Sequence, residues 1–231
     1  FCPSFVTVEG GALRKPDALD MGDEFRRRVE QLPLPQLQPL TKPFDLLVGG
    51  VGGTGVVTVG ALITMAAHLE GKGASVLDFM GFAQKGGSVL SYVRLAQKPE
   101  LLHQVRIDYG MAEALIACDM IVGTDPRALN VLRHDHTRII VNLSELPSGD
   151  FVLIRDADMQ ADLRIKTLQQ AVGKERVDTL DANNLAEKLL GNTVFSNIFL
   201  LGYAWQMGLV PVSLEALLRA IEINGVAVEA N

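Results

Sequence analysis

The feature that most constrains the fold is a glycine-rich turn between two apolar segments. Five candidate binding residues lie in this turn: Gly50, Gly52, Gly53, Thr54 and Gly55. Glycine permits a tight strand-to-helix turn and lets backbone approach an anion, and free N–H groups at a helix start attract negative charge. We therefore expect a strand over Asp45–Val48 and a helix over Gly53–Glu70. Between them lies either an anion site or a tightly packed turn without a ligand.

Beyond Pro43 the chain alternates short apolar runs with helical periods, which is typical of a parallel sheet with crossover helices. Further strands are predicted at Ser75–Phe79, Val89–Leu95, Met120–Gly123, Arg138–Leu143, Phe151–Arg155 and Arg176–Leu180. Further helices are predicted at Met111–Ala117, Pro126–Arg133, Met159–Val172, Asn184–Leu190, Val194–Met207 and Leu214–Ile221. The predicted fold is an α/β, doubly wound, mostly parallel, Rossmann-like sheet with helices on both faces and an all-helical C-terminal tail.

Residues 1–43 differ from residues 44–231 and are predicted to form a separate N-terminal segment. They contain a short β-like piece at Ser4–Val8 and a charged stretch, Asp23–Arg28, that is typical of a solvated helix face. Four of the ten prolines follow, so Leu32–Pro43 should run extended as a linker rather than as a core element. The chain begins at Phe1 without Met, and we expect a segment of a longer protein.

Composition excludes several classes of function. A formal net charge of -6 leaves no basic field that could neutralise a run of phosphates, so nucleic acid is not an expected partner. The two cysteines form neither a disulfide framework nor a complete paired-Cys metal site, which favours a cytoplasmic location. The apolar run Val56–Leu69 is interrupted by polar residues and is too short to span a bilayer.

A nicotinamide- or flavin-dependent dehydrogenase is one alternative. Asp78 ends the second predicted strand, where a dinucleotide-binding domain places the residue that binds ribose. The loop over Met80–Gly87, however, leads into another strand instead of a helix. His134 and His136 are two positions apart and are expected to be exposed loop residues rather than metal ligands. A non-catalytic interaction module is a second alternative, which the apolar helical tail favours.

Several motifs in sequence order point to one family. They are the runs Leu47–Val57, Gly81–Arg94, Ile107–Gly110 and Ala117–Gly123. Together they resemble the γ-type domain of 2-oxoacid:ferredoxin oxidoreductases, from about Phe44 to the end of the chain. The Ala-Gln-Lys-Gly-Gly run at 83–87 is more similar to the indolepyruvate (aryl-2-oxoacid) branch. Residues 1–8, 214–217 and 220–231 also resemble the large fused bacterial enzymes of that branch.

The resemblance implies an enzyme that oxidatively decarboxylates a 2-oxoacid to an acyl-coenzyme A. Thiamine diphosphate with Mg²⁺ would form the reactive intermediate, [4Fe-4S] clusters would carry electrons to ferredoxin, and coenzyme A would take the acyl group. No thiamine diphosphate motif is visible here. The resemblance therefore implies that this chain has no catalytic residue and holds no cofactor alone. Its partners would be the thiamine-binding and iron–sulfur domains or subunits, ferredoxin and further copies of itself in a homo-oligomer.

Within such an enzyme, the resemblance implies that the glycine turn and the Met80–Gly87 loop shape the substrate or coenzyme A entrance. The further binding candidates are Gln84, Lys85, Gly86, Gly87 and Arg94. Lys85 and Arg94 would be anion partners, although an ordinary surface or structural ion pair is the alternative for each. Cys2 would be one ligand of a cluster completed outside this chain, with an unliganded thiol as the alternative.

Three other features are expected to be structural. Cys118 lies in an apolar run typical of a buried core thiol. Asp125 precedes Pro126 and should cap a helix. The predicted helix with Asn197 and Trp205 should belong to the core or to an interface.

Overall fold

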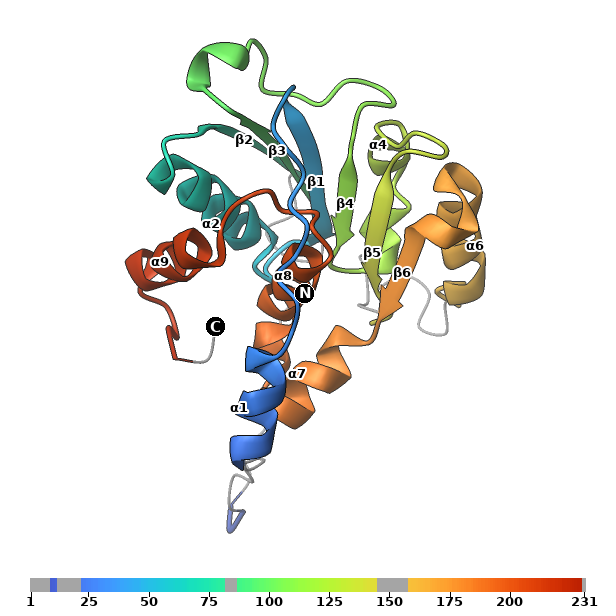
Figure 1. The fold of residues 1–231 in the computed structure, drawn as a ribbon. Helices are drawn as coiled ribbons and strands as arrows, with labels where there is room; N and C mark the ends of the chain where they lie inside the picture. The colour runs from blue at the N-terminus through green and yellow to red at the C-terminus, as the bar shows by residue number, and fades with distance from the viewer. Residues whose placement is uncertain (1–8, 12–21, 82–86, 145–157, 230–231) are drawn as a thin grey trace.

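The computed structural model describes residues 9–11, 22–81, 87–144 and 158–229, which form a six-stranded sheet in the order β2-β3-β1-β4-β5-β6 (Figure 1). The strands are β1 (Phe44–Val51), β2 (Gly73–Met80), β3 (Ser88–Ala96), β4 (Ala114–Ala117), β5 (Arg138–Asn142) and β6 (Val177–Leu180). Strands β1, β4, β5 and β6 are parallel, whereas β3 is antiparallel to both β1 and β2. The predicted mostly parallel α/β sheet is confirmed.

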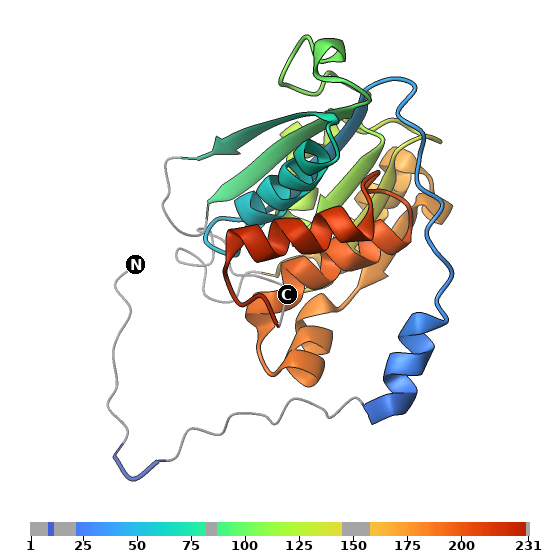
Figure 2. The ribbon, with the colours of Figure 1, turned by 60° about the vertical axis from the view of Figure 1, so that its left-hand side comes forward.

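Helices cover both faces of the sheet, as Figures 1 and 2 show. One face carries α2 (Val56–Leu69), α8 (Ser196–Gln206) and α9 (Leu214–Asn224), and the other carries α3 (Met120–Gly123), α4 (Pro126–Leu129) and α6 (Ala161–Val172). Before the sheet comes α1 (Gly22–Glu30), and α7 (Ala182–Leu190) opens the helical tail. Short 3-10 helices lie at η1 (Pro99–Leu101), η2 (Lys174–Arg176) and η3 (Thr193–Phe195). The predicted helical C-terminal tail is confirmed.

The core consists of two apolar clusters separated by the sheet. Successive side chains of a strand point to opposite faces, so Leu46 and Val48 of β1 pack with α2 and α8, whereas Leu47 packs with α3 and α6. All three are fully buried. Burying a leucine side chain contributes about 1.5–3 kcal/mol. Strand β1 is therefore fixed from both sides, and the turn that follows it starts from a rigid base.

The predicted helix Met111–Ala117 is wrong, because Ala114–Ala117 form β4 at the centre of the sheet. Leu47 of β1 pairs with Leu115 in parallel register, and Leu115 pairs in turn with Ile139 of β5. Alanine and leucine favour helices locally, but all four residues of β4 are fully buried between neighbouring strands. Tertiary pairing outweighs helix propensity here.

The predicted strand Met120–Gly123 is also wrong, because these residues form the helix α3. Asp119 adopts an extended conformation and accepts a hydrogen bond from the Val122 N–H at 2.8 Å, which is an N-cap. The aspartate before the apolar run was a start signal for a helix. An apolar run of this length cannot by itself distinguish a buried strand from a buried helix.

Other elements differ mainly in their ends. The helix predicted over Pro126–Arg133 stops at Leu129, and its expected cap is confirmed because the Asp125 carboxylate accepts from Arg127 N–H at 2.9 Å. The helix predicted from Gly53 starts at Val56, since Gly53 and Gly55 have positive φ. The strands predicted at Ser4–Val8 and Phe151–Arg155 lie outside the described residues.

The proline-rich segment is more closely attached to the domain than a simple linker. Leu40 is 7% exposed and belongs to the core cluster of α2 and α8. The Gln206 side chain donates to the Pro33 carbonyl at 2.7 Å, and the Gln36 carbonyl lies so close to Gly208 that no Cβ fits there. The expectation that this segment contributes nothing to the core is wrong at Leu40. Figure 2 shows the segment running along the domain.

Within the described residues, no helix combines the length and apolarity that crossing a bilayer requires.

Candidate functional site

The glycine turn has a conformation and close packing that favour glycine over other residues. A Cβ on Gly50 would lie 2.6 Å from Val56 Cγ2 and 2.8 Å from Cys118 Cβ, so Gly50 allows β1, α2 and the end of β4 to pack closely. Gly53 and Gly55 have φ of 90° and 95°, which L side chains rarely adopt. Gly55 precedes α2 without a side-chain cap, so the first N–H groups of this 14-residue helix face the turn.

A buried carboxylate supports the turn from behind. The two oxygens of Asp119 accept from the N–H groups of Val51 at 2.7 Å and Val122 at 2.8 Å. Asp119 is not exposed to solvent, and burial raises its pKa although the backbone bonds oppose that shift. Sequence analysis missed this residue. Its signal is an aspartate two residues after the end of the apolar strand β4, at the edge where the glycine turn also lies.

A polar side chain from the helical tail also holds the turn. Asn197 of α8 is 4% exposed and donates from Nδ2 to the Thr54 carbonyl oxygen at 2.7 Å. The Thr54 hydroxyl donates to the Val51 carbonyl at 2.8 Å. These bonds fix the backbone between β1 and α2. These hydrogen bonds are consistent with the expectation that the helix containing Asn197 is structural. They also place the Asn197 side chain at the candidate site.

A pocket of about 340 Å³ lies beside the turn. Its walls come from Gly53–Gly55, the first turns of α2 and α8, and the segment after α9. Thr58 and Asn197 contribute polar groups, whereas Phe195 and Ile198 contribute apolar surface. Apolar walls with a few polar groups and free helix N–H groups can accept an organic anion.

The glycine turn contacts the end of the predicted loop. Gly52 N–H donates to the Gly87 carbonyl at 2.7 Å, and a Cβ on Gly52 would lie 3.3 Å from that oxygen. The structure thus brings together the five turn candidates and Gly87 at the carboxyl end of β1. Gln84, Lys85 and Gly86 lie outside the described residues. Loop and turn meet where open α/β sheets bind ligands.

Arg94 does not lie with the other candidate residues at the glycine turn. Its Nε and Nη2 donate to the two oxygens of Asp45 at 2.6 and 3.2 Å, and Nη1 donates to the Gln104 carbonyl. Arg94 pairs in register with Asp45 near the start of β1, about 17 Å along the strand from the glycine turn. Burial raises the pKa of Asp45, and the Arg94 bonds oppose this shift. Arg94 thus forms the structural ion pair that was the alternative interpretation.

Asp78 does not occupy the position of a ribose-binding residue. In a dinucleotide-binding fold the strand that ends in this acidic residue lies beside the first strand. Here β3 separates β2 from β1, so Asp78 lies two strands away from β1, about 10 Å. Its carboxylate accepts a short hydrogen bond from the Ser91 hydroxyl. The sheet order argues against the dehydrogenase alternative.

The described residues offer no group of three or more metal-ligating side chains. His134 is exposed, whereas His136 is half-buried, with Nε2 3.7 Å from the Glu113 carboxylate. Cys118 is buried, as expected, and burial raises the pKa of its thiol, which keeps it protonated. Cys2 lies outside the described residues. The described part of the chain therefore does not fit an iron–sulfur cluster or the metal of thiamine diphosphate.

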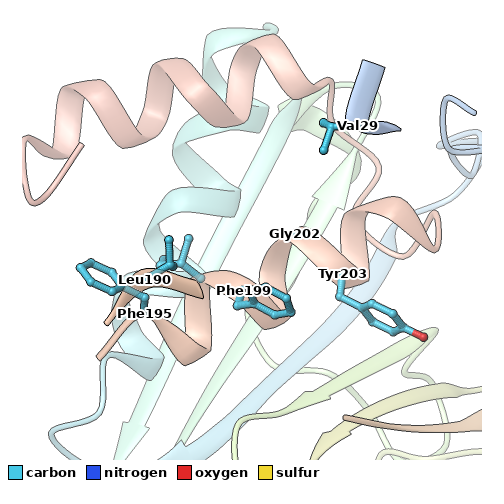
Figure 3. A pocket seen from close by; sticks show the side chains of 7 residues that line it. Val29, Leu190, Phe195, Phe199, Gly202 and Tyr203 are labelled. Carbon is cyan, nitrogen blue, oxygen red and sulfur yellow. The ribbon is translucent and has the colours of Figure 1, made fainter. Parts of the chain in front are cut away.

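A second pocket, of about 430 Å³, lies along α8 and shares Phe195 and Ile198 with the first pocket (Figure 3). Phe195, Phe199 and Tyr203 line it together with Leu190 and Val29. The Tyr203 hydroxyl is the polar side-chain group of this lining, and no charged side chain contributes to it. Its chemistry suits apolar surface rather than an anion.

The comparisons with known proteins give one matching family model and several solved structures with a similar fold. A family model described as pyruvate ferredoxin/flavodoxin oxidoreductase matches residues 45–231. Pyruvate oxidoreductase subunit PORC of Thermotoga maritima has a TM-score of 0.56 at 18% identity, with 82% of this chain and 91% of that chain covered. The gamma subunit of a keto/oxoacid ferredoxin oxidoreductase from Geobacter sulfurreducens has a TM-score of 0.54 at 20% identity, with 81% and 90% covered.

A third similar structure is 2-oxoglutarate:ferredoxin oxidoreductase from Magnetococcus marinus with 2-oxoglutarate, coenzyme A and succinyl-CoA bound. Its TM-score is 0.56 at 17% identity, and the alignment covers 80% of this chain but 27% of that one. In that protein the matching fold is therefore one part of a longer chain. No curated protein matches this sequence significantly.

Proposed function

We propose a role for this chain on the basis of its family. The chain belongs to the pyruvate ferredoxin/flavodoxin oxidoreductase family. It is thus a part of a 2-oxoacid:ferredoxin oxidoreductase. In our proposal, its glycine turn and the loop before Gly87 shape the entrance for coenzyme A and substrate. Other domains or subunits supply thiamine diphosphate with Mg²⁺, the [4Fe-4S] clusters and the contact with ferredoxin.

The observation that carries this proposal is the hydrogen bond between Gly52 N–H and the Gly87 carbonyl. It joins the two segments that hold nearly all the candidate residues, at one edge of the sheet. Coenzyme A is an elongated anion with phosphate groups and an aromatic base whose ring faces can pack against apolar surface. The uncapped start of α2 suits a phosphate, and the adjoining pocket with Phe195 and Ile198 suits an apolar group.

The substrate would be an aryl-2-oxoacid of the indolepyruvate type. The run Ala-Gln-Lys-Gly-Gly at 83–87 supports this branch. A substrate panel on the assembled enzyme tests it: kcat/KM should be higher for indolepyruvate than for pyruvate or 2-oxoglutarate. A preference for either of the two smaller acids would contradict the assignment.

Lys85 would contribute a cation to the coenzyme A entrance. In the assembled enzyme, Lys85→Ala should raise the KM for coenzyme A by about 10-fold, because a charge-assisted contact to phosphate is lost. Lys98 is an exposed lysine just beyond the opposite end of β3, so Lys98→Ala is the matched control and should change the KM less than about 2-fold. Equal KM values in the two variants would overturn the role of Lys85.

A further inference from the structure

Arg127, at the start of α4, is held in one orientation by its neighbour Asp125. Its Nε donates to Asp125 Oδ1 at 2.9 Å and its Nη2 donates to Oδ2 at 2.7 Å, a two-point pairing that fixes the guanidinium plane. Its backbone N–H also donates to Oδ1. Hydrogen bonds from Arg127 lower the pKa of Asp125, so the carboxylate remains ionised at neutral pH.

The fixed guanidinium contacts both strands of the β2–β3 hairpin. Nη2 donates to the hydroxyl of Ser88, the first residue of β3, at 2.5 Å. The guanidinium carbon lies 4.9 Å from the ring centroid of Phe79, near the end of β2. Phe79 is 48% exposed, and Arg127 is one of the groups that hold its ring. One side chain thereby ties together the end of β2, the start of β3 and α4.

The hairpin end continues directly into the glycine turn. Ser88 is bonded to Gly87, whose carbonyl accepts the hydrogen bond from Gly52 N–H at 2.7 Å. The Ser88 carbonyl in turn accepts from Gly81 N–H at 3.4 Å. A chain of contacts therefore runs from Arg127 through Ser88 and Gly87 to Gly52. Movement of the hairpin end away from α4 would strain or break the Gly52–Gly87 bond.

These contacts suit positioning better than stability. The Arg127 and Asp125 side chains are 35% and 20% exposed, and ion pairs with that much solvent around them add little to the free energy of folding. The geometry of the contacts is nevertheless well defined. One guanidinium group pairs with two carboxylate oxygens, donates to a hydroxyl and lies against an aromatic ring. Sequence analysis missed Arg127 because its partners other than Asp125 lie on β2 and β3, 39 positions away in the case of Ser88.

We propose that Arg127 is a positioning residue of the coenzyme A entrance: it holds the β2–β3 hairpin end against α4 and so keeps the Gly87 carbonyl on Gly52 of the glycine turn. This inference rests on the proposed function for the identity of the ligand. The contact chain itself is a property of the fold.

The test compares Arg127→Ala and Arg127→Lys in the full-length enzyme. Arg127→Ala should raise the KM for coenzyme A about 5- to 10-fold while kcat changes less than about 2-fold, since the entrance and not the chemistry is altered. Arg127→Lys should fall between wild type and Arg127→Ala, because an ammonium keeps the charge but cannot reach two carboxylate oxygens and Ser88 in one plane.

Arg106 provides the matched control. Its guanidinium lies over the ring of Tyr92 on β3, at 5.9 Å, and the residue is exposed. Arg106→Ala therefore also removes an arginine from an aromatic ring of the β2–β3 hairpin, but this ring is Tyr92 of β3 and lies nearer the amino end of β1. This variant should change neither the KM for coenzyme A nor the hydrogen-exchange rate of the Gly52 amide. An increase equal to that of Arg127→Ala would overturn the proposal.

Amide hydrogen exchange separates this inference from the identity of the ligand. In Arg127→Ala the Gly52 amide should exchange about 10-fold faster without ligand, whereas the Cys118 amide, bonded to the Gly49 carbonyl, should not change. Unchanged Gly52 exchange would overturn the positioning role. Faster exchange with an unchanged KM for coenzyme A would support the contact chain and overturn coenzyme A as the ligand of the turn.

Discussion

Asn197 and Thr54 are 143 positions apart in the sequence, and the Asn197 side-chain amide donates to the Thr54 carbonyl at 2.7 Å. The bond links the helical tail to the glycine turn. It explains how α8, which has no charged residue near its start, controls the backbone at the carboxyl end of β1. The tail is therefore a part of the candidate site as well as of the core.

Asn197→Ala should destabilise the domain by about 1–3 kcal/mol, because the half-buried Thr54 carbonyl loses its hydrogen bond from this buried side chain. It should also raise the KM for coenzyme A, since the turn is no longer held. Asn224 lines the same pocket from the end of α9, and Asn224→Ala should change the free energy of unfolding by less than about 0.5 kcal/mol. Denaturant unfolding of both variants measures the difference, and equal losses would contradict it.

Gly50→Ala should destabilise the domain by about 1–3 kcal/mol, because the added Cβ overlaps Val56 and Cys118. Gly202 of α8 has no atom within 4 Å of a built Cβ. Gly202→Ala should therefore stabilise the domain by about 0.5–1 kcal/mol through helix propensity. Thermal unfolding gives the sign of each change. A neutral Gly50→Ala would show that the packing between β1 and the end of β4 relaxes easily.

Leu40→Ala should cost about 2–4 kcal/mol, because Leu40 is buried in the core although it lies in the proline-rich segment. Leu34, in the same segment, is 83% exposed, and Leu34→Ala should cost less than about 0.5 kcal/mol. Chemical denaturation distinguishes the two. If both variants unfold like the wild type, the segment is a linker that does not stabilise the fold.

His136 should make the stability depend on pH. Burial, with Arg133 nearby, lowers the pKa of His136 from its usual value of 6.5. Below that value the unfolded chain binds the proton more readily than the folded one, so this contribution to stability is complete above 6.5 and is lost on acidification. His136→Gln should show a smaller loss of stability between about pH 7.5 and pH 5.5. Parallel curves for the two proteins would contradict the assignment.

Sequence analysis located the glycine turn and the strand and helix around it because glycine spacing and apolar runs act locally. It also located the strands β2, β3, β5 and β6 within a few residues. The residues of β4 were predicted to form a helix, and the residues of α3 were predicted to form a strand. Both are apolar runs of four residues, and at that length periodicity does not separate the two states.

By itself, the sequence determined that this chain forms a mostly parallel α/β sheet with a glycine-rich turn between its first strand and the following helix, because glycine conformation and apolar patterning are properties of neighbouring residues. Only the tertiary structure decided that β3 inserts between β1 and β2 and that Arg94 pairs with Asp45. It also decided that Asp119 and Asn197 form hydrogen bonds with the backbone of the turn and that Arg127 contacts Ser88. Those relationships join residues dozens of positions apart. They depend on which strands become neighbours, and no local pattern encodes that choice.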